Sequence, residues 1–162
     1  MSKNTFFVSI FLMLHLLGKA QSPDILYQKF SKGYDILDAA LISNLYARDA
    51  ELINLYKNAA PKSFKGRKAI LNFFESLFNL ADEESKSLKI VFKITDRQEN
   101  GVSILDNGFY HLCVSSAHHE TYDRYGKFSI VLQKESGEWK FFTDANSSAT
   151  REEFEKATSI NP

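Results

Sequence analysis

Hydrophobic residues recur at helical spacing in the first half of the chain. They stand three or four positions apart at Leu26, Phe30, Tyr34, Leu37 and Leu41. Ser22-Pro23-Asp24 is a suitable helix start. The pattern predicts a helical segment that continues to Tyr46, with a break near Asp38.

A second helix is predicted over residues 67–80, directly after Gly66. Its apolar face consists of Ile70, Phe73, Phe74, Leu77 and Phe78. Residues 50–56 predict a short strand before it. Residues 58–62 are expected to form a loop, because Pro61 cannot join a central ladder. The polar residues 82–86 are expected to form a solvated connection.

The period then changes to two, which predicts strands. They cover residues 88–95, 102–115, 122–135 and 139–144. Asn107-Gly108 suits a turn or a bulge, and the bulge is favoured because hairpin strands here would be very short. Thr150 with Glu153 forms a capping-box pattern for a final short helix. Helices followed by an antiparallel meander predict an α+β fold.

Residues 1–20 have the pattern of a signal peptide. Lys3 precedes an apolar run from Phe6 to Leu17, and the small residues Gly18 and Ala20 precede a cleavage site before Gln21. A buried first helix is the alternative, but the run lacks amphipathic spacing. We therefore expect an exported protein, periplasmic or secreted, whose residues 21–162 form a single domain.

Charge and cysteine content exclude several classes of function. The chain has 20 basic and 20 acidic residues, and removal of Lys3 and Lys19 leaves 18 against 20. This balance gives no electrostatic case for a nucleic-acid partner or for a membrane partner after signal removal. Cys113 is the only cysteine, so no intramolecular disulfide forms. It is expected to be a small buried hydrophobic residue.

Three segments together resemble the nuclear transport factor 2-like superfamily, and within it the SnoaL-like exported bacterial proteins of unassigned function. They are LYARDAELI at 45–53, KGRKAILNFF at 65–74 and GEWK at 137–140. The resemblance covers nearly all of residues 24–148. It implies a cone, in which a strongly curved antiparallel sheet wraps around N-terminal helices and leaves a cavity at the wide end. It also implies a homodimer formed through the outer face of the sheet.

Three residues of these motifs are expected to serve the architecture. Asp49 is expected just after a helix end, where its carboxylate would accept backbone N–H groups. Gly66 permits a backbone geometry that a side chain would resist. Arg67 is expected to pair with a carboxylate such as Asp49.

The steroid isomerases of this superfamily provide a residue-by-residue comparison. Their catalytic carboxylate lies five residues after the Asp of the Asp-Ala pair, and this position is Asn54 here. Asn54 cannot act as a general base. Their oxyanion-stabilising tyrosine corresponds to Phe30, with Tyr34 one helical turn away. Both differences count against isomerisation by that residue set.

Other polar residues offer few sites. His118, His119, Glu120 and Asp123 have metal-ligand composition, but adjacent residues of a strand face opposite ways, so we expect no metal site. His111 either faces the cavity as an acid/base group or lies on the outer face, and the outer face is favoured. Asp144 could rim the pocket or cap a loop. No cofactor is expected.

The leading hypothesis is a domain that binds a small apolar or amphipathic molecule in an aromatic-lined cavity. Its expected lining residues are Phe30, Tyr34, Tyr46, Asn54, Phe92, Tyr110, Phe128 and Trp139, about half of the aromatic ones touching the cavity. One alternative is a dehydratase-type lyase or an isomerase that uses Tyr34, His111 or Asp144. The other is a non-catalytic dimerisation or interaction module with a filled cone. Convergence of two ionisable groups in one pocket would favour the enzyme.

Overall fold

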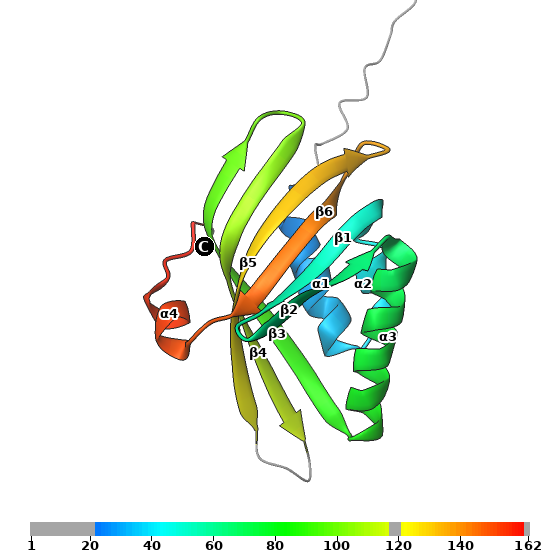
Figure 1. Cartoon of the computed structure of the whole chain (residues 1–162), viewed down its shortest axis with the longest axis vertical. Helices are drawn as coiled ribbons and strands as arrows, with labels where there is room; N and C mark the ends of the chain where they lie inside the picture. The colour runs from blue at the N-terminus through cyan, green and yellow to red at the C-terminus, as the bar shows by residue number, and fades with distance from the viewer. Residues whose placement is uncertain (1–21, 117–120, 161–162) are drawn as a thin grey trace, which may run out of the picture.

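The computed structural model describes residues 22–116 and 121–160 and contains both helices and one sheet (Figure 1). The helices are α1 (Asp24–Asp35), α2 (Ala39–Ser43), α3 (Arg67–Glu83) and α4 (Arg151–Lys156). The strands are β1 (Tyr46–Tyr56), β2 (Ala59–Lys65), β3 (Lys86–Glu99), β4 (Ser103–Ser116), β5 (Tyr122–Glu135) and β6 (Glu138–Ser148). The predicted α+β class and curved sheet are confirmed.

The predicted signal peptide lies outside the described residues. Within the described ranges, no helix combines the length and apolar character needed to cross a bilayer.

The six strands form one sheet in the order β2-β1-β6-β5-β4-β3. Strands β3 to β6 form the predicted antiparallel meander. Strand β1, however, pairs with β6 in parallel, with Leu52 opposite Asp144 and Asn54 opposite Asn146. The sheet is therefore mixed, since β6 follows β1 only after four further strands and runs in the same direction beside it.

The first helical segment breaks where the sequence predicts. Asp38 is the N-cap of α2, and its carboxylate accepts the backbone N–H of Leu41 at 2.7 Å. Helix α2 ends at Ser43, earlier than predicted, and β1 begins at Tyr46 rather than Ala50. Pairing of Tyr46 with Phe141 of β6 holds this early part of β1 extended.

The prediction of a loop over residues 58–62 is wrong for residues 59–62, because β2 begins at Ala59. Strand β2 is the edge of the sheet and pairs only with β1. Pro61 lies where the register shifts, between the pairs Asn54–Lys62 and Tyr56–Ala59. An edge strand tolerates proline at such an irregularity, since no neighbouring strand needs its missing N–H.

Two bulges change which residues face inward. Strand β4 continues through Asn107-Gly108, and the extra residue of the predicted bulge is Thr95 on the paired strand β3. A second irregularity lies on β6, where Phe141 pairs with Leu132 and Thr143 pairs with Val131. This bulge at Phe142 was not predicted, and it shifts the alternation of the remainder of β6 by one residue.

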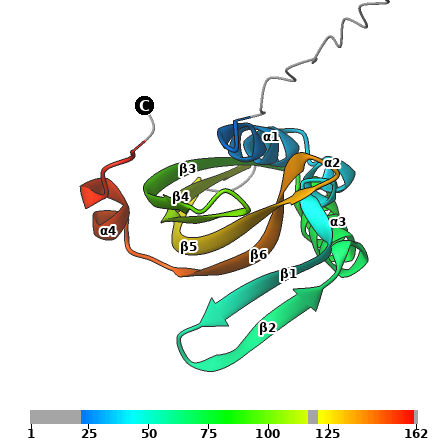
Figure 2. The same ribbon diagram turned by 90° about the horizontal axis from the view of Figure 1, so that it is seen from above.

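The core lies between the concave face of the sheet and the first three helices. Tyr46, Phe74 and Phe141 are fully buried there, and the ring of Phe30 packs edge-on against those of Phe74 and Phe141. Helix α4 lies on the other side of the molecule from α3 (Figure 2). Its predicted capping box is present, with the Glu153 N–H bonded to Thr150 Oγ1 at 3.1 Å.

The three motif residues have structural roles that differ in part from those predicted. Gly66 has φ of +80°, and its N–H donates to Ala50 O at 2.7 Å directly before α3, as a glycine permits. Asp49 is exposed within β1 rather than in a turn. Arg67 pairs with Glu135 at 2.6 Å instead of Asp49, and its Nε also donates to Tyr46 O. The early start of β1 explains both differences.

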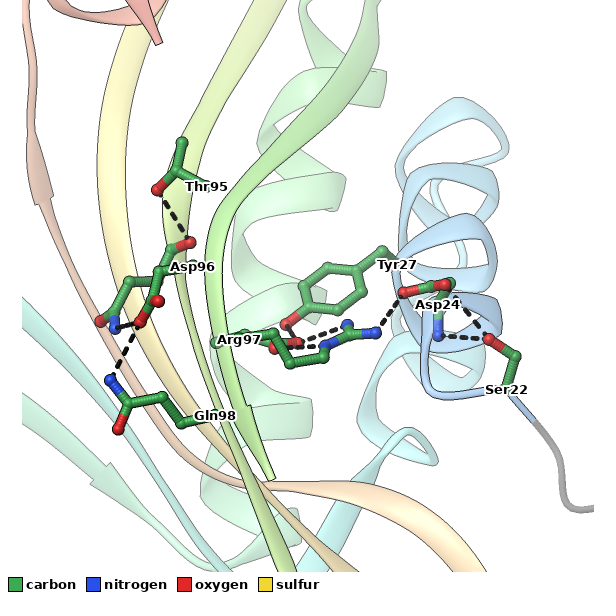
Figure 3. Close-up of polar contacts among 9 residues, drawn as sticks. Ser22, Asp24, Tyr27, Thr95, Asp96, Arg97 and Gln98 are labelled. Carbon is green, nitrogen blue, oxygen red and sulfur yellow. Dashed lines mark hydrogen bonds and ion pairs between the residues drawn. The ribbon is translucent and has the colours of Figure 1, made fainter. Parts of the chain in front are cut away.

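A fully buried carboxylate attaches α1 to the sheet. Asp106 of β4 accepts two hydrogen bonds from Arg97 of β3, at 2.6 and 2.8 Å, and one from the Tyr27 hydroxyl at 2.7 Å. Figure 3 shows Asp24 and Tyr27 pointing from α1 towards Arg97, which also pairs with Asp24 at 2.8 Å. Hydrogen bonds to Asp106 and Asp24 raise the pKa of Arg97, although burial partly opposes this. The network therefore fixes α1 over the sheet.

Replacement of Arg97 by methionine should strongly destabilise the protein. The change leaves the carboxylate of Asp106 buried without its cation, which typically costs about 3–5 kcal/mol. Urea unfolding measures this loss. Arg151→Met is the matched control, because Arg151 pairs with Glu155 on the exposed surface of α4. Equal stability of the two variants would contradict the role given to Asp106.

Candidate functional site

A cavity of about 640 Å³ lies between α1, α3 and the concave face of the sheet. Most of its wall is apolar and aromatic, with side chains from α1, α3 and every strand except β2. Its polar side chains include Tyr34, Asn54, Tyr110, Asp144 and Asn146. The volume is in the range of small-molecule sites, and it does not fit a completely filled cone.

Most residues expected to line the cavity do so. Those that line it are Phe30, Tyr34, Asn54, Phe92, Tyr110 and Phe128. Tyr46 and Trp139 are absent from its wall. Tyr46 is fully buried behind it, and the Trp139 ring lies 4.8 Å from the ammonium of Lys134. Both side chains belong to the packed core and not to the cavity surface.

Asp144 is a buried carboxyl group in the cavity wall. Only 7% of its surface is exposed, and Tyr46 donates a hydrogen bond to its Oδ2 at 2.6 Å. Burial raises the pKa of Asp144 to about 6, although hydrogen bonds from Tyr46 and Asn146 oppose the increase. No cation in the described residues pairs with it. The carboxyl group therefore exchanges its proton near neutral pH, which suits proton transfer.

The bulge on β6 places Asp144 in the cavity. Before the bulge, Trp139 and Phe141 face the interior; after it, Asp144 and Asn146 line the cavity. Strict alternation from Phe141 would instead have turned Thr143 inward. Asp144 thus lies in the middle of the sheet, between Leu52 of β1 and Ile130 of β5, and not at a strand end.

Tyr34 presents a free hydroxyl to the same cavity. The residue is only 8% exposed, yet its hydroxyl makes no hydrogen bond within the described part of the chain. Among those residues, every side-chain polar atom that is completely enclosed has a hydrogen-bond partner. The Tyr34 oxygen has none, so it is not completely enclosed and is open to the cavity. Burial is the largest cause that raises the pKa of Tyr34, and electrostatic interactions with Tyr110 and Asp144 raise it further. Tyr34 is therefore a protonated donor available to a ligand.

Tyr110 is a second phenol of the cavity, and glycine makes room for it. Its ring lies against Gly126 on the paired strand, where an added Cβ would be 2.1 Å from the ring. Burial and then the charge of Asp144 raise the pKa of Tyr110, whereas Arg124 opposes them. Two phenols and a carboxyl group thus converge on one aromatic cavity.

Asn54, the position that the sequence resemblance assigned to the isomerase base, lines the cavity. Its side-chain oxygen accepts a hydrogen bond from Asn146 at 3.0 Å. Because β1 and β6 are neighbours, Asp144 lies one strand away from Asn54 and two positions back in register. An amide and a carboxyl group from neighbouring strands therefore line the same cavity.

His111 faces the outer surface, the alternative that the sequence favoured. Its Nε2 lies 2.7 Å from Asp123, and its ring stacks on Tyr125 and packs against Phe154 of α4. Cys113 is half-buried, whereas the sequence predicted a buried residue. His118, His119 and Glu120 lie outside the described residues. The described residues contain no group of three potential metal ligands.

Sequence reasoning missed several residues of the cavity wall. They include Tyr27, Asn146 and Arg124. Tyr27 directly follows Leu26 in α1, so a prediction with a wider apolar face for this helix would have placed Tyr27 on the buried side. The inward position of Asn146 depends on the β6 bulge, which no sequence signal predicts. Arg124 stands two residues before Gly126 on the same strand face, and strand alternation would have placed it beside the cavity.

Solved structures with the same fold include proteins of several described activities. A nuclear transport factor 2-like protein from Novosphingobium aromaticivorans matches with a TM-score of 0.63, 14% identity, and coverage of 78% of this chain and 79% of that chain. A putative dehydratase from Streptomyces avermitilis matches with a TM-score of 0.61, 10% identity, and coverage of 78% and 93%. A ketosteroid isomerase-like protein from Erwinia carotovora atroseptica matches with a TM-score of 0.60, 11% identity, and coverage of 78% and 93%.

No protein-family model matches the sequence, and no curated protein matches it. The structural matches nevertheless confirm that the chain has the nuclear transport factor 2-like fold, which includes SnoaL-like proteins. At these identities they show the fold alone.

Replacement of Asp144 by asparagine should stabilise the protein in a pH-dependent way. The folded-state pKa of about 6 exceeds the ordinary aspartate value of 3.8, so the native protein binds the extra proton and wild-type stability falls as pH rises between these values. Between pH 4.5 and 7.5, wild type should lose about 2 kcal/mol relative to Asp144→Asn.

Urea unfolding at both pH values measures this difference, and Asp49→Asn controls for removal of an exposed carboxylate from β1. A constant difference between wild type and Asp144→Asn across this range would show that Asp144 is not perturbed by burial.

Proposed function

We propose that this nuclear transport factor 2-like domain is an acid–base enzyme of the lyase or isomerase type, acting on a small carbonyl compound with an apolar body. The observation that carries the proposal is the convergence of Asp144 and Tyr34 in one aromatic cavity. The carboxyl group has a pKa of about 6, and the phenol has a hydroxyl without a partner in the described chain. Together they are the proton acceptor and the donor that such chemistry needs.

Proton abstraction next to a carbonyl group uses these two residues in distinct roles. Above pH 6 the Asp144 carboxylate is ionised and takes the proton from the α-carbon. The electron pair of the broken C–H bond forms the enolate double bond, and the carbonyl oxygen gains negative charge. The hydroxyl of Tyr34 donates a hydrogen bond to that oxygen. Tyr46 holds the acceptor in place through its 2.6 Å hydrogen bond to Oδ2.

The enolate has two routes onward, and both conserve atoms and charge. In an isomerase, the protonated Asp144 returns its proton to another carbon of the conjugated system. In a lyase, a hydroxyl group on the β-carbon departs and takes up the proton as water. The structural neighbours described as a dehydratase and as isomerase-like support this class of reaction without selecting one route.

Export and homodimer formation stay predictions. Export depends on residues 1–20. The dimer was expected on the outer face of the sheet, and α4 covers part of that face through the contacts of Phe154 with His111 and Tyr125. A dimer of this chain would therefore use the uncovered part of the face or include α4.

Hydrogen–deuterium exchange tests proton abstraction without knowledge of the natural substrate. The protein is incubated in D₂O at pD 7.5 with 1-indanone, 1-tetralone and cyclohex-2-enone, and loss of the α-proton signal is followed by NMR. We expect wild type to accelerate exchange of at least one ketone. Asp144→Asn should slow that exchange by about 100-fold or more, because general base catalysis typically contributes this much.

Tyr34→Phe should also slow the exchange, by about 10- to 1000-fold, because the enolate loses a donor. Saturation-transfer NMR checks that each variant still binds the ketone, and Asp49→Asn should exchange at the wild-type rate. If the ketones bind and exchange no faster than in buffer, or if none of them binds, the acid–base proposal fails. Binding without exchange would favour the non-catalytic alternative.

A further inference from the structure

Two cationic side chains lie at the exposed part of the cavity wall. Arg124 is on β5, on the same strand face as Gly126 and Phe128, and Lys57 is in the turn between β1 and β2. Both residues are exposed, whereas Asp144 in the same wall is 7% exposed. The cations therefore mark the mouth of the cavity, and the carboxyl group marks its interior.

Arg124 differs in its partners from three of the four other arginines of the protein. Arg67, Arg97 and Arg151 each bind a carboxylate. The guanidinium of Arg124 has no carboxylate within 4.0 Å in the described residues and lies 5.3 Å from the centre of the Tyr122 ring. A planar guanidinium stacked on an aromatic ring keeps its N–H edge available for an anion.

The nearby acidic residue of the wall does not neutralise this charge. Asp123 precedes Arg124, but its carboxylate binds His111 at 2.7 Å on the outer face of the sheet. The charge of Arg124 also acts on the cavity, since it opposes the increase in the pKa of Tyr110 that burial and Asp144 cause. The mouth therefore favours an anion, whereas the interior near Asp144 disfavours one.

We propose that the ligand of this cavity is an amphipathic organic carboxylate. Its apolar body of one or two rings fills the aromatic interior, and its carboxylate binds Arg124, with Lys57 as a second cation. A carboxylate suits Arg124 because the guanidinium offers two parallel N–H donors to its two oxygens. This inference rests on the cavity of the proposed function and adds an orientation, in which the uncharged end of the ligand enters first and reaches Asp144 and Tyr34.

The orientation also makes the two charges of the site compatible. An ionised ligand could not approach Asp144 with its carboxylate without like-charge repulsion in a desolvated place. Held at the mouth, the same carboxylate keeps most of its hydration and gains the attraction of Arg124. The reacting carbonyl group of the ligand would then lie at the opposite end of the apolar body.

A matched pair of probes tests the charge preference. Isothermal titration calorimetry compares 2-naphthylacetate with 2-naphthylacetamide, which share one apolar body, at pH 7.5 in 50 mM salt. We expect the acid to bind about 10-fold more tightly than the amide, and this ratio to fall at 500 mM salt because the mouth is exposed. Arg124→Gln should reduce the ratio to about one and leave amide binding unchanged.

Three further variants make the result specific. Arg124→Lys should keep part of the preference, because the charge remains without the paired donors. Lys57→Gln should reduce the preference less than Arg124→Gln does. Lys127→Gln is the matched control, since Lys127 is on the same strand but lies near Glu153 on the outer face and should not change the ratio.

Equal binding of acid and amide to wild type would overturn the inference, as would a preference that Arg124→Gln leaves intact. Equal weakening of both probes in Arg124→Gln would also overturn it, because that result indicates loss of the pocket and not of the charge. These outcomes are independent of ketone exchange. Loss of exchange with a retained acid preference would reject only the acid–base function, and the reverse would reject only the anionic ligand.

Discussion

The buried ion pair between Asp106 and Arg97 is the interaction on which the cavity depends. Asp106 is fully buried, so its charge is tolerable only while Arg97 and Tyr27 donate to it. Both donors come from elements that must be in place, since Arg97 is on β3 and Tyr27 is on α1. The pair thus sets the position of α1 over the sheet. That position in turn sets where Phe30 and Tyr34 meet the cavity.

The second buried carboxyl group of the structure has the opposite character. Asp106 is balanced by a cation, whereas Asp144 is held by the hydroxyl of Tyr46 and the amide of Asn146. Burial raises the pKa of Asp144 to about 6, because the neutral donors Tyr46 and Asn146 offset the cost of a buried charge only in part. The protein therefore carries a destabilising group at the point where chemistry is proposed, a common feature of functional sites.

The polar groups of the cavity are ordered from its interior to its mouth. Asp144 and Tyr34 are almost completely buried, Tyr110 is half-buried, and Arg124 is exposed. Aromatic rings such as those of Phe92 and Phe128 fill the wall and separate the charges. This order suits a ligand with one charged end and one reactive end. The proposed chemistry and the proposed ligand class therefore follow from a single arrangement.

The sequence by itself determined the fold class and most of the elements, because these depend on local periodicity. The apolar spacing from Leu26 to Leu41, the glycine before α3 and the alternation along β5 are visible without neighbours. Tertiary structure decided the site. The bulge at Phe142 turned Asp144 and Asn146 inward. This bulge depends on the pairing of β6 with β5, and a local sequence pattern does not show that pairing. Parallel pairing of β1 with β6 placed Asp144 one strand away from Asn54, an arrangement that no local pattern along the chain shows.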